Sequence, residues 1–244
     1  MKVGIIGAGN MGSAFARRLS AAGHDVFISS RNIDDAKRVA TSVGGGVRAV
    51  PQQQLAESVD LLIAATPYAQ QAKALGATGK IDGKAVIEIS NPLKPDMSGL
   101  AVGHTTSAAE EVAKAAPRAR IVKAFNTIFA QLLSERPAAA RGARVQVFYA
   151  GDDAAAKATA RSLIDSMAFE PVDAGPLSNA RYLEPLGMLN IYFGHVAKMG
   201  TDIAPAVRKV SAQQPADSSA DEVTRQPLQA AKETGREEPR RSPG

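Results

Sequence analysis

The chain has 244 residues and a formal net charge of +5, and 45% of its residues are apolar, which is enough for a sizeable core. The absence of cysteine excludes disulfides, thiolate metal sites and a cysteine nucleophile, and it fits a cytoplasmic location. No apolar run approaches the ~18 residues of a membrane span, and the basic residues are scattered. We therefore expect neither a membrane nor a nucleic-acid partner.

Short apolar runs rich in β-branched residues alternate with helical patterns along most of the chain. This alternation predicts parallel βαβ units, and hence an α/β fold with a doubly wound parallel sheet of the Rossmann type and a small α/β C-terminal extension. The expected strands are residues 3–6, 25–29, 47–50, 61–65, 85–89, 120–124, 145–150 and 170–173. The expected helices are residues 11–22, 33–43, 52–58, 68–77, 107–116, 156–167 and 179–199, the last interrupted by Pro185.

The motif GAGNMG follows the first expected strand and opens the first expected helix. In this context it predicts a dinucleotide-binding loop: Gly7 permits the tight turn, Gly9 lets the backbone approach a pyrophosphate, and Gly12 lets helix and strand pack closely. The helix N-terminus would supply free N–H groups for phosphate. A glycine turn that binds nothing is the alternative.

The second expected strand ends in Ser29, Ser30 and Arg31, where NAD-binding proteins usually carry an acidic residue ~20 residues after the glycine motif. A carboxylate there binds the ribose hydroxyls and repels a 2′-phosphate. Ser30 and Arg31 instead favour that phosphate, because serine can donate a hydrogen bond to it and the guanidinium is permanently charged. NADP(H) is therefore favoured over NAD(H). Arg31 as the start of a solvated helix is the alternative.

Ligands of open α/β sheets bind beyond the carboxyl ends of the strands. The residues that follow the fourth, fifth and sixth expected strands are therefore candidates for the reaction site. They are Thr66 and Pro67, then Ser90, Asn91, Pro92 and Leu93, then Phe125, Asn126 and Thr127. Strand ends and turns alone would also explain the prolines.

No acid–base machinery is evident in the sequence. His24, His104 and His195 have no metal-ligand companion at useful spacing, and a structural role is at least as good an explanation for each. We assign no catalytic residue and no metal. A nicotinamide pocket without a proton donor suits hydride transfer to a second redox ring, where positioning dominates.

From Met1 to about Gly200 the chain resembles the NADPH-dependent reductases of the deazaflavin coenzyme F420. The resemblance rests on GAGNMG, SSR, SNPL, TTSAAEEVAKA, VKAFNTI, YAGDDAAAK and, most specifically, FEPVDAGPLSNARYLEPL. The NADPH domain of the STEAP metalloreductases is similar in the same places. Asp35 departs from the family pattern, which has a basic residue there, and AFNT is closer to the metalloreductases.

The resemblance implies an NADP(H)-binding Rossmann domain over residues 1–128, an extension over residues 129–200 and a homodimer. It also implies that residues Ala8, Asn10 and Met11 lie along the pyrophosphate. The hydride acceptor would be coenzyme F420 or a flavin, FAD or FMN. Residues 201–244 lie outside the resemblance, and we expect a disordered tail there because it has few large apolar side chains.

Two other functions stay open. A pyrroline-5-carboxylate reductase or β-hydroxyacid dehydrogenase also opens with IGAGNMG, but those enzymes need a larger helical domain than this chain offers. An NADPH-binding sensor or scaffold without turnover would need no acid–base residue either.

Overall fold

The computed structural model describes residues 1–134 and 144–208. Its contacts divide the chain into two units, Met1–Val207 and Arg208–Gly244, and the fold described below is that of the first. The tail over residues 201–244 was expected to be disordered, and from residue 209 onward it lies outside the described residues.

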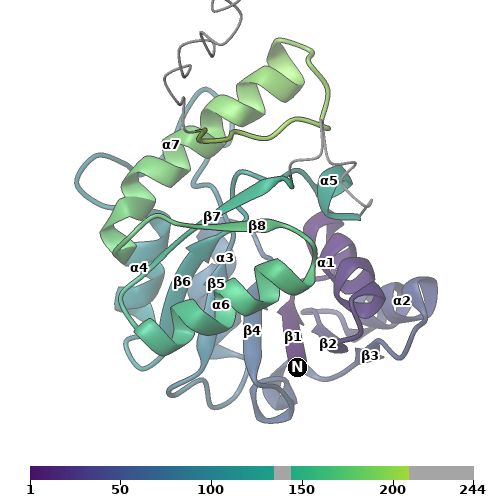
Figure 1. Ribbon diagram of the computed structural model, residues 1–244. Coiled ribbons are helices and arrows are strands. Elements are labelled where there is room, and N and C mark those ends of the chain that lie inside the picture. Colours follow the sequence, from purple (N-terminus) through teal and green to yellow (C-terminus); the bar gives the residue numbers. More distant parts are fainter. Residues whose placement is uncertain (135–143, 209–244) are drawn as a thin grey trace, which may run out of the picture. The chain divides into compact units, whose positions relative to one another are not determined.

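The first unit is built on one eight-stranded sheet with the strand order β3-β2-β1-β4-β5-β6-β7-β8 (Figure 1). Neighbouring strands are parallel except β6 and β7, which are antiparallel. The strands are β1 (Lys2–Ile6), β2 (Asp25–Ser29), β3 (Arg48–Ala49), β4 (Leu61–Ala64), β5 (Ala85–Glu88), β6 (Arg120–Ala124), β7 (Gln146–Gly151) and β8 (Glu170–Asp173). The chain runs from β1 to one side and then from β4 to the other, which confirms the predicted doubly wound fold.

The helices agree with the sequence pattern over most of their length. They are α1 (Asn10–Ala21), α2 (Ile33–Val43), α3 (Tyr68–Gly76), α4 (Ala108–Ala115), α5 (Ala130–Ser134), α6 (Ala154–Ser166), α7 (Ala180–Ile191), the 3-10 turns η1 (Gln52–Gln54), η2 (Ala56–Ser58) and η3 (Leu177–Asn179), and the π turn η4 (Tyr192–Val196). None of the described helices is long and apolar enough to cross a membrane.

Three details differ from expectation. The helix predicted over 52–58 is two short 3-10 turns, and α5 was not predicted. Pro185 lies inside α7 instead of interrupting it. Pro185 removes the hydrogen bond that its position would give to the carbonyl of Arg181, and the helix continues past it.

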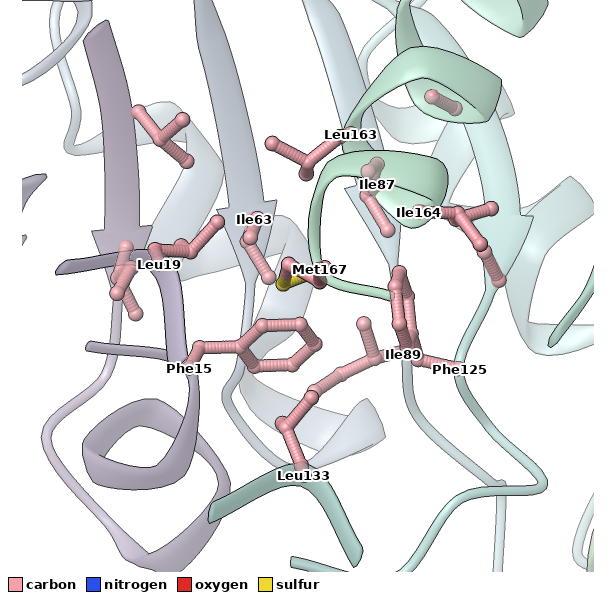
Figure 2. Close-up of a cluster of buried hydrophobic side chains, with 14 of the residues drawn as sticks. Phe15, Leu19, Ile63, Ile87, Ile89, Phe125, Leu133, Leu163, Ile164 and Met167 are labelled. Atoms are coloured by element: carbon pink, nitrogen blue, oxygen red, sulfur yellow. The ribbon is translucent and has the colours of Figure 1, made fainter. Parts of the chain in front are cut away.

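Helices cover both faces of the sheet. On one face, α1, α5 and α6 bury the largest cluster of apolar side chains, in which Phe15, Leu133 and Met167 surround Ile63 and Ile87 of the sheet (Figure 2). On the other face, side chains of α3, α4 and the first turn of α7 form a second cluster. Both clusters leave the carboxyl ends of β1, β4, β5 and β6 free to form a site.

Candidate functional site

A cleft lies at the carboxyl ends of β1, β4, β5 and β6. It consists of two adjoining cavities of about 250 and 630 Å³ that share Gly9, Ala65, Thr66 and Pro67. The smaller cavity lies over the glycine loop and the end of β2, and the larger one lies over the turns after β5 and β6. The two halves that the sequence predicts separately are thus parts of one cleft.

The glycine loop has the backbone contacts that its motif predicts. A Cβ atom on Gly12 would lie 1.9 Å from the carbonyl oxygen of Gly7, and one on Gly7 would lie 2.7 Å from the carbonyl oxygen of Ala65. Gly9 has no heavy atom within 4 Å of its Cβ position, so its surface is open to a ligand. No side chain caps the first turn of α1 and none in it is acidic, so its N–H groups are free for phosphate.

Ser30 and Arg31 line the smaller cavity, as the 2′-phosphate hypothesis requires. Arg31 is exposed and makes no ion pair with any described residue. Lys37 and Arg38, farther along α2, each pair with an aspartate three residues earlier. Their charges are therefore compensated locally, whereas Arg31 and Lys73 of α3 line this cavity and form no ion pair with any described residue.

Three buried polar atoms beside the larger cavity have no hydrogen-bond partner among the described residues. They are Thr66 Oγ1, Ser90 Oγ and Asn126 Oδ1, and all three residues line the cleft. An unpaired buried oxygen costs about 1–3 kcal/mol. A polar ligand in the cleft would remove that cost, which fits a nicotinamide or the polar edge of a second ring.

Three asparagines join the turns after β5 and β6 to each other and to α7. Asn91 Nδ2 donates to the carbonyl of Asn126 at 2.8 Å, and Asn126 Nδ2 donates to Asn91 Oδ1 at 3.0 Å and to the carbonyl of Leu183 at 2.7 Å. Asn190 Nδ2 donates to the carbonyl of Thr127 at 3.1 Å. These bonds fix α7 as a wall of the larger cavity.

Phe125 lies both in the core and at the cavity. Its ring packs edge-on against Phe15 at 5.1 Å and Phe169 at 6.0 Å between centroids, and its backbone has a φ of 59°. A left-handed conformation is rare for a bulky residue, and aromatic packing on both sides holds it there. The strained turn directs Asn126 and Thr127 toward the cleft.

Tyr68, at the start of α3, is a lining residue that the sequence did not single out. Its hydroxyl donates a hydrogen bond to Glu111 Oε2 on α4. Burial, followed by that bond and the charge of Glu111, raises the pKa of Tyr68 to about 12. Tyr68 therefore keeps its proton throughout the neutral range.

A fully buried ion cluster lies behind the turn that follows β5, formed by residues 90–92 and called the SNP turn below. Lys123 Nζ contacts Glu88 Oε2 at 2.6 Å, Glu184 Oε1 at 2.8 Å and the carbonyl of Ser90 at 2.5 Å. Glu184 also accepts hydrogen bonds from two backbone N–H groups at the start of α4. Burial raises the pKa of the Glu184 carboxyl, and the charge of Lys123 opposes that shift. The cluster connects β5, β6, α4 and α7 behind the cavity.

The DAGPLSNAR segment, the most specific part of the resemblance, lines neither cavity. Asp173 accepts a hydrogen bond from the N–H of Gly175 at 2.8 Å, and Asn179 Nδ2 donates to the carbonyl of Ala174 at 2.6 Å. Arg181 forms a two-pronged pair with Glu110 of α4, which lowers the pKa of that carboxyl. The segment shapes the turn into α7 and docks that helix.

Most predicted site residues meet in the cleft, and two do not line it. The lining includes Gly7, Ala8, Gly9, Asn10, Met11, Ser30, Arg31, Thr66, Pro67, Ser90, Asn91, Leu93, Phe125, Asn126 and Thr127. Gly12 lies beneath the loop, where its missing side chain permits the packing described above. Pro92 is the last residue of the SNP turn, and it is buried.

The sequence did not identify the contribution of α7 and η4. Gly187, Asn190, Ile191 and His195 line the larger cavity, together with Met97 and Phe129. The smaller cavity is also lined by Gln52, Gln70 and Lys73. Helical periodicity shows which side chains share a face, and it does not show that the face closes a site formed by distant strands.

Comparison with known proteins agrees with this geometry. The family model described as NADP oxidoreductase, coenzyme F420-dependent, matches residues 2–92. The F420-dependent NADP reductase of Methanothermobacter marburgensis is 28% identical over 207 residues, which cover 78% of this chain and 91% of that protein. A crystal structure of a putative F420-dependent NADP reductase from Arthrobacter sp. FB24 has a TM-score of 0.75 and 27% identity over 86% of this chain and all of that one.

The metalloreductase STEAP3 of Rattus norvegicus is 32% identical over 190 residues, or 77% of this chain. Those residues are 37% of the rat protein, so this chain spans well under half the length of that relative.

Proposed function

We propose that this chain, which matches the family model of coenzyme F420-dependent NADP oxidoreductases over residues 2–92 and is 27–28% identical to proteins named as F420-dependent NADP reductases, transfers a hydride between NADPH and a deazaflavin or flavin. The observation that carries this proposal is the continuity of the cleft. A phosphate-binding half opens directly into a wider half, so two ring systems can meet at the residues the halves share.

The NADPH end uses the residues around the glycine loop. The first turn of α1 would bind the pyrophosphate through its free N–H groups, and Ser30 and Arg31 would bind the 2′-phosphate. Thr66 and Pro67, shared by both cavities, would lie against the nicotinamide. NADPH bound in this way supplies the hydride.

The acceptor end is wide and mainly apolar. Its lining includes Met11, Ile89, Leu93, Met97, Phe125, Ile128, Phe129 and Ile191. These side chains would hold a flat ring and exclude water, and the oxygens of Ser90 and Asn126 would meet its polar edge. Catalysis by the chain would then consist mainly of orienting the two rings.

Cofactor selectivity tests the phosphate assignment. We expect Arg31→Ala to weaken NADPH binding by about 10- to 100-fold and to leave NADH binding nearly unchanged, because a guanidinium–phosphate pair contributes about 1.5–3 kcal/mol. Arg17→Ala is the matched control, since Arg17 is an exposed arginine of α1 that does not line the cleft. Equal NADPH and NADH affinities in the unmodified chain would refute the assignment.

The acceptor is tested by anaerobic mixing. The protein with NADPH is combined separately with coenzyme F420, FMN and FAD, and the absorbance of each oxidised ring is followed. Reduction of one of them supports the proposal and identifies the acceptor class. Tight NADPH binding without reduction of any of them would favour the sensor or scaffold function instead.

We also propose that the protein is a homodimer. Support comes from a stripe of exposed large apolar side chains along α7, η4 and the residues that follow: Leu189, Tyr192, Phe193, Val196 and Met199. They recur at intervals of three and four residues, as in a helix face that packs on a partner. Sedimentation equilibrium of the full chain and of Val196→Glu tests this, and a monomeric unmodified chain would refute it.

A further inference from the structure

Two side chains in the lining of the larger cavity have a titratable proton, Tyr68 and His195. The other described lining residues are apolar, glycine, amide or aliphatic hydroxyl residues. Tyr68 is engaged with Glu111 and holds its proton in the neutral range. An imidazole, in contrast, ordinarily exchanges a proton near pH 6.5. His195 is therefore the side chain suited to proton transfer in this cavity.

The local structure brings His195 to the cavity wall. It lies in the π turn η4, which continues α7, and such turns are frequent at functional sites. A Cβ atom on Gly194 would lie 2.6 Å from Phe129 Cζ and 3.1 Å from the carbonyl oxygen of Gly200, so only glycine allows the turn to pack this closely. The His195 ring then meets the Phe129 ring edge-on at 5.4 Å between centroids.

Reduction of a deazaflavin or flavin by NADPH consumes one proton in addition to the hydride. We propose that His195 donates this proton to the acceptor ring, an inference that rests on the proposed function. As a hydride reaches C5 of a deazaflavin, or N5 of a flavin, a second ring nitrogen gains negative charge and basicity. His195 supplies a proton to that nitrogen: an imidazolium N–H bond breaks, its electron pair stays on the imidazole, and an N–H bond forms on the acceptor.

The proton balance closes without another reactant. NADPH, the oxidised acceptor and one proton give NADP⁺ and the reduced acceptor, and His195 recovers its proton from water because its side chain is exposed at the rim. In the reverse direction the neutral imidazole would accept the proton. The other ionisable residues of this region are Tyr68 in the same lining, Lys198 three residues farther along the chain, and Asp202, whose carboxylate lies beside Gly200.

Anaerobic stopped-flow kinetics test the role of His195. We expect the rate of acceptor reduction by the unmodified chain to fall as pH rises, because only the protonated imidazole can donate. His195→Gln should lose that pH dependence and react about 10²-fold more slowly at pH 6, with NADPH affinity unchanged. His104→Gln is the matched control, because His104 is an exposed loop residue outside the cleft. Unaltered rates and pH profile in His195→Gln would overturn the proposal.

A binding measurement provides a second readout that does not depend on turnover. The chain has three histidines, so their imidazole NMR signals can be assigned with the two glutamine variants. NADP⁺ together with the oxidised acceptor, a combination that cannot react, should shift the His195 signal and its titration while the His104 signal stays in place. A His195 signal that does not respond would overturn the inference. If the unmodified chain reduces no acceptor, the proposed function itself fails, which is a different outcome.

Discussion

Gly187→Ala would change the shape of the acceptor cavity without removing any polar group. Gly187 lies in α7, where its missing side chain admits the asparagine pair. A Cβ atom there would lie 2.5 Å from Asn91 Oδ1, 2.7 Å from Asn126 Nδ2 and 2.9 Å from the carbonyl oxygen of Asn126. Ordinary contact begins at 3.4 Å, so the asparagines and α7 must separate by roughly 0.5–0.9 Å.

The energetic terms of this substitution partly offset each other in stability, while the wall of the cavity still moves. Alanine favours a helix interior over glycine by about 1 kcal/mol. Displacing the asparagines weakens two or three hydrogen bonds worth about 1 kcal/mol each. We therefore expect a net destabilisation of about 1–2 kcal/mol. A displacement of this size in a site that works by orientation should lower the acceptor kcat/KM by about 10- to 100-fold.

The assay compares three quantities in the unmodified chain and the variant: kcat/KM for the acceptor, the NADPH dissociation constant and the free energy of unfolding in urea. NADPH affinity should stay within about twofold, because Gly187 lines only the larger cavity. Gly76→Ala is the matched control, since a Cβ atom at this helical glycine meets nothing within 4 Å. If Gly187→Ala retains the kcat/KM of the unmodified chain, the asparagine pair does not set the shape of the cavity.

Other substitutions test the remaining parts of the site. Gly12→Ala should weaken NADPH binding by at least about tenfold in fluorescence titration, because its methyl group would collide with the backbone of Gly7. Tyr68→Phe should lower the free energy of unfolding near neutral pH by about 1 kcal/mol. Because the folded-state pKa of Tyr68 is raised to about 12, the contribution of its hydroxyl is complete below pH 10 and is lost as pH rises through 12. The stability curves of the unmodified chain and the variant should therefore converge there. Lys123→Met should destabilise the fold by about 3–5 kcal/mol in urea because it leaves two buried carboxylates without their cation, and the loss should shrink as pH falls, because burial raises the pKa of Glu184. A loss that is independent of pH would contradict that account.

The sequence predicted the cofactor half of the cleft better than the acceptor half, for a physical reason. Gly7, Gly9 and Arg31 belong to one βαβ unit, whose internal geometry is nearly the same in every protein that contains it. The acceptor half combines two turns joined by a bond across 35 residues, from Asn126 to Asn91, with a helix joined by a bond across 57 residues, from Asn126 to Leu183. No local pattern encodes such contacts.

The same contrast shows how the acceptor half is held together. Glu184 caps α4 and pairs with Lys123, whose ammonium also contacts Glu88 and the carbonyl of Ser90. The SNP turn, the strands behind it and α7 therefore share one buried network, and none of its four members belongs to the glycine loop. A change in α7 can move the acceptor wall while the residues that bind NADPH keep their positions. Under the proposed function, the fold would separate the two specificities: the first βαβ unit would select the nucleotide, and the docking of α7 would determine which ring can lie against it.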